Sequence, residues 1–221
     1  MRCKFIVALL LLAGATVAFA DDSNMDQRIA DLAHRWATIS YTTPEAQRDA
    51  AFVDVIANAQ TISQAFPGNA EPLIWQAIVL GSAAKVEGGL GALHKAKEAR
   101  DLLLTAETIN PTALDGSIYS SLGSLYGKVP GWPIGFGDRN KARGYLEKAL
   151  AIDPTGIDAN YFYADFLADK GEYAESVVYL KRALAAPARP GRDDADAGRR
   201  RDVASLLEML KRKHGDELAT K

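Results

Sequence analysis

The fold of this chain is decided by KAKEARDLLLTAETINP at residues 95–111, a stretch that returns at residues 138–154 as DRNKARGYLEKALAIDP. The shared positions are Ala99, Leu103, Ala106 and Pro111 in the first copy and Ala142, Leu146, Ala149 and Pro154 in the second. The small residues would let a neighbouring helix approach closely, while the leucine fills the space between the helices. The proline ends each helix, because the residue before a proline is pushed out of the helical region. The spacing therefore predicts helices that repeat along the chain.

Further copies extend this repeat in both directions. YAESVVYLKRALAAP at residues 173–187 places Ser176, Leu180 and Ala183 in the same frame, and a fainter copy ends at Pro67. We therefore predict an all-α solenoid of helical hairpins, with about three units and a capping helix at each end. The predicted segments are a signal peptide (1–20), an N-terminal capping helix (21–44), the repeat domain (45–187), a linker (188–196) and a C-terminal capping helix (197–221).

A second pattern precedes the repeated helix. In YSSLGSLY, the residues Tyr119, Leu122, Gly123 and Tyr126 lie on one helix face, and Gly123 would allow close packing there. A large residue, leucine-glycine and tyrosine on one helix, followed by alanine, a large residue, alanine and proline on the next, resembles the tetratricopeptide repeat. The resemblance covers roughly residues 45–187 and implies a scaffold that presents helix surfaces to protein partners.

Two of the units are longer than a typical repeat of about 34 residues. Pro154 to Pro187 spans 33 residues, whereas Pro67 to Pro111 spans 44 and Pro111 to Pro154 spans 43. The surplus falls near residues 85–91 and at residues 127–137, and we expect both insertions to replace the tight turn between paired helices. Insertions in solenoids gather on one face, often the binding face, so the two should lie near each other.

The insertion at residues 127–137 contains Trp132, Ile134 and Phe136 among two prolines and four glycines. In one interpretation these three side chains form an apolar finger that docks a partner, since aromatic anchors dominate interface energetics. In the other, the loop folds back on its own helices with Trp132 as its plug.

The segments YGKVPGWPIGFGD (126–138) and GGLGALHKAKEAR (88–100) together are similar to a narrower group. They resemble the periplasmic T-component family of tripartite ATP-independent periplasmic (TRAP) transporters. This resemblance implies a homotrimer that associates with a periplasmic substrate-binding protein.

The first helix of each unit should line a concave inner surface, so its polar residues are candidate partner contacts. Asp158, Tyr161, Asp165 and Asp169 form a stripe along one helix side. Gln76, Lys85 and Lys128, with Ser120 and Ser124, could line the same groove. Such a groove would be partly acidic and would favour a basic or neutral polar partner over a free carboxylate. The alternative is a merely solvated helix face.

The N-terminus predicts export. Arg2 and Lys4 form a basic head, residues 5–13 are apolar, and Ala18-Phe19-Ala20 is a cleavage signature with the predicted cut after Ala20. We therefore expect a periplasmic or secreted protein. No later stretch is long and uncharged enough to span a membrane. Cleavage would also remove the one cysteine, Cys3.

Charge and motifs argue against other classes of function. Loss of Arg2 and Lys4 from a chain with 26 basic and 28 acidic side chains leaves a net charge of −4, which disfavours nucleic-acid binding. His34, His94 and His214 lack the spacing of a zinc helix, and the glycines at residues 88–91 lack the spacing of a phosphate loop. We expect no enzyme activity, metal or cofactor. The predicted function is an exported scaffold for proteins of the cell envelope, with the TRAP T-component as the alternative.

Overall fold

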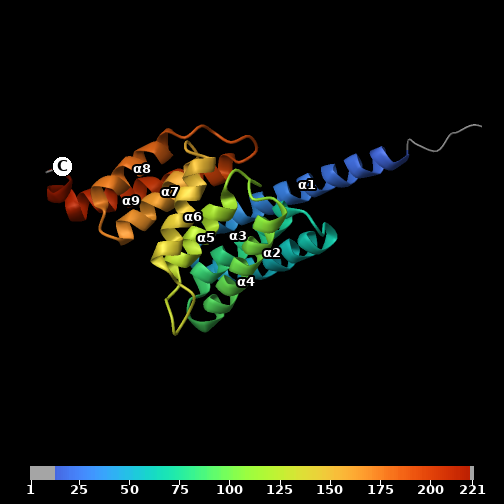
Figure 1. The fold of residues 1–221 in the computed structure, drawn as a ribbon, viewed down its shortest axis with the longest axis horizontal. Helices are drawn as coiled ribbons and strands as arrows, with labels where there is room; N and C mark the ends of the chain where they lie inside the picture. Colours follow the sequence, from blue (N-terminus) through green and yellow to red (C-terminus); the bar gives the residue numbers. More distant parts are fainter. Residues whose placement is uncertain (1–12, 220–221) are drawn as a thin grey trace, which may run out of the picture.

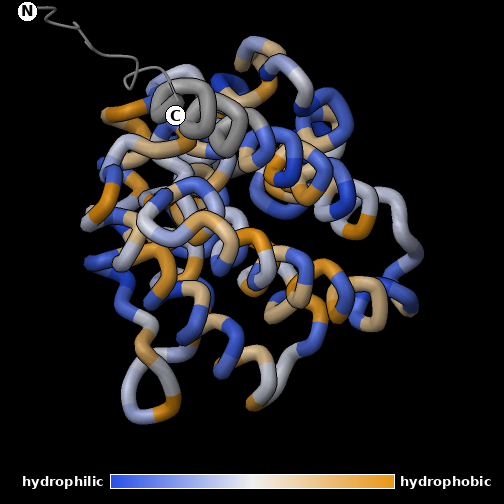
Figure 2. Tube along the Cα trace, turned by 90° about the vertical axis from the view of Figure 1, so that its right-hand side faces the viewer, coloured by the Kyte–Doolittle hydropathy of each residue, from blue (hydrophilic) through white to orange (hydrophobic). Residues whose placement is uncertain are grey.

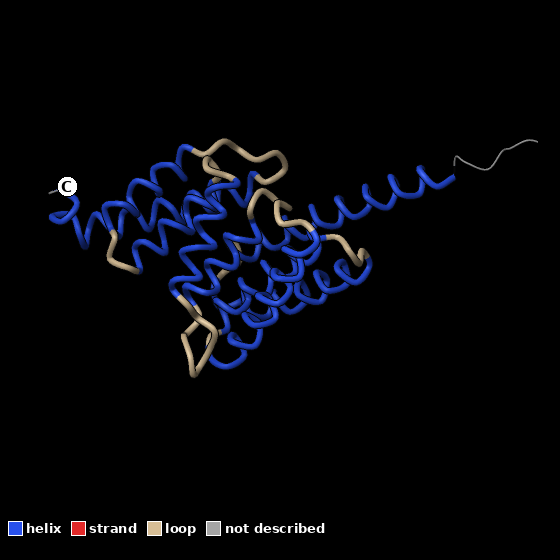
Figure 3. Tube along the Cα trace, in the orientation of Figure 1, coloured by secondary structure: helices blue, strands red, loops and turns tan. Residues whose placement is uncertain are grey.

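The computed structural model describes residues 13–219, with side chains from 24 to 215, and this part of the chain is built of helices joined by short loops (Figure 1). The helices are α1 (Ala13–Tyr41), α2 (Glu45–Ala65), α3 (Ala70–Glu87), α4 (Gly89–Ile109), α5 (Ser117–Lys128), α6 (Arg139–Ile152), α7 (Ile157–Asp169), α8 (Tyr173–Ala185) and α9 (Asp193–Ala219). Between residues 13 and 219 there is no strand, and the predicted all-α class is confirmed (Figure 3).

Consecutive helices pack as hairpins, with α3 against α4, α5 against α6 and α7 against α8. The repeated positions are the interior of these hairpins. Leu103, Leu146 and Leu180 are fully buried, as are the small residues that precede and follow each of them in the repeat frame. The alanine-leucine-alanine frame therefore does set how the helices pair.

The odd-numbered helices form an inner layer that closes on itself. Helix α5 contacts α3 and α7, α7 contacts α9, α9 contacts α1, and α1 contacts α3. Where α9 meets α1, a methyl group on Gly198 would lie 2.2 Å from ring atoms of Tyr41, so α9 can approach α1 this closely only because residue 198 is glycine. Helix α9 therefore runs along the inner face and does more than cover one end.

The two insertions have different structures. Residues 129–138 form a loop between α5 and α6 that projects beyond the helices at the lower end of the molecule (Figure 2). The prediction of a loop near residues 85–91 is wrong. Only Gly88 separates α3 from α4, and the surplus residues lengthen these helices to 18 and 21 residues. Leu93 lies against Gly135 of the loop, so the two insertions do lie side by side as predicted.

The ends of the chain differ in detail from the predicted segments. Residues 1–12 of the predicted signal peptide lie outside the described residues, and α1 continues from Ala13 through most of the predicted capping segment. At the other end, α9 begins at Asp193, so the last four residues of the predicted linker are helical. Among the described helices, none combines the length and the apolar character needed to cross a membrane.

Gly123 provides a test of the hairpin packing. An added Cβ there would lie 2.5 Å from Cγ of Leu146, whereas one at Gly144, in the middle of α6, would meet nothing within 4 Å. We expect Gly123→Ala to lower the free energy of unfolding by about 1–3 kcal/mol through overpacking. Gly144→Ala should raise it by about 0.5–1 kcal/mol, because alanine favours a helix. Urea unfolding of both variants checks this, and a neutral Gly123→Ala would contradict close packing of α5 on α6.

Candidate protein interaction surface

The base of the loop at residues 129–138 is fastened to the helices. The ring of Phe136 packs edge-on against Tyr126, with centroids 5.3 Å apart, and the guanidinium carbon of Arg100 lies 4.5 Å from its centroid. The Asp138 amide donates to the Tyr126 carbonyl at 2.9 Å, and the Asp138 carboxylate accepts from the first backbone amides of α6. Phe136 is thus the side chain that holds the loop in place.

The prediction of Trp132 as the plug of this loop is wrong. Trp132 is 90% exposed and Ile134 is 65% exposed. The Gly131 carbonyl accepts hydrogen bonds from the amides of Ile134 and Gly135, so Trp132 lies in a tight turn with its side chain in solvent. The glycines on either side of the Trp-Pro-Ile segment were the sequence signal for such a turn.

Three of the predicted residues come together at the C-terminal ends of α5 and α7. Lys128 bridges Asp165, at 2.8 Å, and Asp169. Burial alone lowers the pKa of Lys128, but the two carboxylates outweigh it and raise the pKa above its ordinary value. Beside this group lies a shallow depression lined by Gly123, Ser124, Gly127, Lys128, Leu146, Phe162, Asp165, Phe166 and Asp169.

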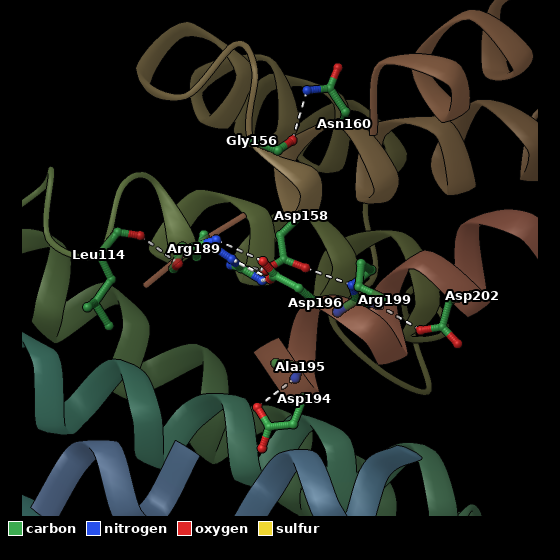
Figure 4. Close-up of polar contacts among 11 residues, drawn as sticks. Leu114, Gly156, Asp158, Asn160, Arg189, Asp194, Ala195, Asp196, Arg199 and Asp202 are labelled. Carbon is green, nitrogen blue, oxygen red and sulfur yellow. Dashed lines mark hydrogen bonds and ion pairs between the residues drawn. The ribbon is translucent and has the colours of Figure 1, made fainter. Parts of the chain in front are cut away.

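The other half of the predicted acidic stripe is covered by α9 and the segment before it. Asp158 lies between Arg189 and Arg199, each of which donates to one of its carboxylate oxygens at 2.7 Å (Figure 4). Arg189 also donates to the buried Asp196 at 2.8 Å. The guanidinium carbon of Arg199 lies 4.6 Å from the ring centroid of Tyr161. The interpretation of Asp158 and Tyr161 as open groove residues is therefore wrong.

Electrostatics fit this closed arrangement. Burial alone would raise the pKa of Asp158, but Arg199 and Arg189 outweigh it and hold that pKa well below its ordinary range. Burial raises the pKa of Tyr161 to about 12, against the opposing effect of Arg199. The partners Arg189, Arg199 and Asp196 were missed in the sequence. The clue was that Asp196, Arg199 and Asp202 follow each other at intervals of one helical turn.

The remaining candidates do not join either group. Gln76 is buried, and its side-chain oxygen accepts a 2.6 Å hydrogen bond from Ser63 of α2, so it belongs to the core. Ser120 is buried as well. Lys85 is exposed near the end of α3. Of the predicted groove residues, Lys128, Asp165 and Asp169, with Ser124 beside them, are the ones that the described structure brings together at an accessible position.

Histidines and acids do not gather into a metal site in the part of the chain from residue 24 to 215. His34 bonds Asp194 at 2.9 Å, which links α1 to α9, and His94 is exposed on α4. These two histidines thus lie on different elements without a shared site.

Comparisons with known proteins support the repeat character of part of the chain. Residues 134–192, which include α6, α7 and α8, match a family model described as tetratricopeptide repeat. A solved structure from Pseudomonas aeruginosa, described as "Functional Characterization of Pseudomonas Aeruginosa pilF", is similar over 89% of this chain and 94% of its own, with 19% identity and a TM-score of 0.36. A search of curated proteins gave no match. The segment from residue 134 to 192 is thus similar to the tetratricopeptide repeats.

Proposed function

We propose that this chain is an exported scaffold that binds a protein partner at the open end of its inner helical face. The observation that carries the proposal is the depression between α5 and α7, where Lys128, Asp165 and Asp169 remain accessible. Arg189 and Arg199 cover the other half of the acidic stripe, at Asp158 and Tyr161. Repeats of this type work by offering helix surfaces to other proteins.

The chemistry of the depression indicates the kind of segment that would bind. Two carboxylates face one ammonium group, so the site carries a net negative charge, and Phe162 and Phe166 provide apolar surface beside it. A partner segment with arginine, lysine or amide donors could take over one of the carboxylates from Lys128. A free carboxylate on the partner would be repelled.

Site-directed crosslinking tests this proposal. The one cysteine of the chain lies in the predicted signal peptide, so a photocrosslinker can be attached to Ser124→Cys in the depression, with Lys181→Cys on the outer helix α8 as the control. We expect a partner to be captured from Ser124→Cys and not from Lys181→Cys. Adding Asp165→Asn and Asp169→Asn should reduce capture at least fivefold with little loss of stability, because exposed ion pairs contribute about 0–1 kcal/mol. Equal capture from both positions would reject the site.

Export is the second part of the proposal and rests on the N-terminal pattern of residues 1–20. N-terminal sequencing of the protein recovered from the cell envelope should read from Asp21. Retention of residues 1–20 in a protein that stays in the cytoplasm would reject it.

A T-component subunit of a TRAP transport system is the second candidate. It is favoured by the loop at residues 129–138, whose Trp132 and Ile134 point outward as subunit contacts would. This role predicts a homotrimer that binds a substrate-binding protein. Light scattering on the purified chain decides, since a strict monomer contradicts it.

A further inference from the structure

The three most exposed large apolar side chains between residues 24 and 215 lie at one end of the molecule. They are Leu90 at 86%, Trp132 at 90% and Ile134 at 65%, and we call them the apolar tip. Leu90 stands one turn before Leu93 on α4, and Leu93 lies against Gly135 of the loop. The view in Figure 2 shows the loop at the lower end with apolar colour at its apex.

The apolar tip is held in place by its base. Phe136 is packed between Tyr126 and Arg100, and the Gly137 amide donates to the Pro130 carbonyl at 2.9 Å, which closes the loop below the tip. Because the loop is already held in one conformation, it loses little conformational freedom when it binds. Most of the free energy gained by burying its exposed side chains would therefore count toward affinity.

Exposed basic side chains lie on the two helices next to the apolar tip, α4 and α6. Lys97 follows Leu93 by four residues and precedes Arg100 by three, so it lies on the side of α4 that faces the loop. Arg139 and Lys141 begin α6 directly after the loop. Lys97 and Arg139 form no ion pair within the described chain, and Lys141 lies over the Tyr126 ring.

Most acidic side chains of these segments form an ion pair or cap a helix. Glu87 pairs with Lys95, Asp101 pairs with Arg100, and Asp138 caps α6. Glu98 is the one exposed acid on residues 85–101 and 128–141 that has no such partner. Asp165 and Asp169, which lie at the base of the loop, share Lys128. The exposed basic side chains Lys97, Arg139 and Lys141, which we call the basic collar, thus stand closest in the chain to the apolar residues at this end.

We propose that the apolar tip and its basic collar dock this protein onto a membrane surface that bears anionic lipid headgroups. Tryptophan is favoured at the level of the headgroups, and each nearby lysine or arginine adds an attraction to an anionic leaflet. Three side chains are far fewer than the 20–30 residues that each partner contributes to a stable protein interface, whereas a bilayer requires no matching shape. The depression at Lys128 lies directly before the loop in the chain, and its test by crosslinking at Ser124 is a separate measurement.

Trp132 is also the probe for the test. Trp36 and Trp75 are buried, so the difference between the emission of the wild type and of Trp132→Phe isolates the exposed indole. With vesicles that contain phosphatidylglycerol at low salt, we expect a blue shift of this emission and protection from acrylamide. With phosphatidylcholine vesicles, or at 0.5 M salt where screening is strong, the shift should be small. All variants should be prepared with the same N-terminus, so that they differ only at the substituted residue.

Vesicle sedimentation of matched variants completes the experiment. We expect binding to fall by tenfold or more in Trp132→Ala and by about fivefold in each of Lys97→Gln and Arg139→Gln. Val53→Ala and Lys181→Gln, which change exposed side chains on α2 and α8, should bind like the wild type. Absence of the shift, or equal binding by Trp132→Ala, would overturn the proposal. A blue shift caused by self-association without vesicles would overturn it too, and would assign the tip to a second copy of the chain. Crosslinking at Ser124 is unaffected by any of these outcomes.

Discussion

Asp158→Asn is expected to lower the free energy of unfolding by about 2–3 kcal/mol, at the low end of the range for breaking a buried pair because a quarter of the Asp158 side chain is exposed. The substitution removes one of the two carboxylates paired with Arg199, which is only 10% exposed, and leaves Asp202 at 3.1 Å as the other. It also removes the ion pair that ties Arg189 to α7. Urea unfolding at pH 7 measures the loss. Asp169→Asn is the control, because that carboxylate is about half exposed and its pair with Lys128 should contribute under 1 kcal/mol.

The effect of Asp158→Asn should also depend on pH. Because the pKa of Asp158 is lower in the folded chain than in the unfolded chain, its stabilisation is fully present above the unfolded value of about 3.9. It is lost progressively as the pH falls below that value toward the folded pKa. The difference in stability between wild type and Asp158→Asn should therefore be constant from pH 7 to 5 and shrink below pH 4. A difference that grows in acid would contradict the ion-pair explanation.

Trp75→Ala should lower the free energy of unfolding by about 3–5 kcal/mol, the usual loss for a buried tryptophan. Trp75 is 2% exposed and meets the ring of Trp36 edge-on with centroids 5.9 Å apart. The guanidinium carbon of Arg192, just before α9, lies 4.8 Å from its ring centroid. Truncation would therefore leave a cavity in the core that joins α1, α2 and α3. It would also remove the contact between Trp75 and Arg192, the residue before α9. Urea unfolding followed by circular dichroism measures the change.

The matched comparison for Trp75→Ala is Trp132→Ala. Trp132 makes no core contact, so this change should alter the free energy of unfolding by no more than about 0.5 kcal/mol. A loss of several kcal/mol in Trp132→Ala would mean that the loop at residues 129–138 stabilises the helices through its tryptophan, contrary to its exposure.

The repeat frame was predictable because it depends on the spacing of residues that are close together in the sequence. Ala99, Leu103 and Ala106 recur at intervals that place them on one helix face, and that face has to be buried whatever lies opposite it. The loop after α5 was predictable for the same reason, because its prolines and glycines cannot continue a helix.

Contacts between distant parts of the chain were not predictable. Nothing near Trp75 or Trp132 in the sequence shows that one is buried in a core with α1 and α2 and the other lies exposed on a turn. The acidic stripe on α7 was recognised, but its partners Arg189 and Arg199 lie 31 and 41 residues further along the chain. The residues near Gly88 fit a loop or two longer helices equally well by composition. Packing of α3 on α4 favours the helices.

The meeting of α9 with α1 limits how this architecture can change. An open array can gain or lose a unit at either end, because each unit contacts only its neighbours and unfolding can proceed piece by piece. Here Gly198 rests on Tyr41 and Ala195 belongs to the same core as Trp36, so the first and last helices share one interior. Adding a hairpin would separate them. The number of hairpins is thus fixed by closure, and the chain should lose its structure in a single cooperative step.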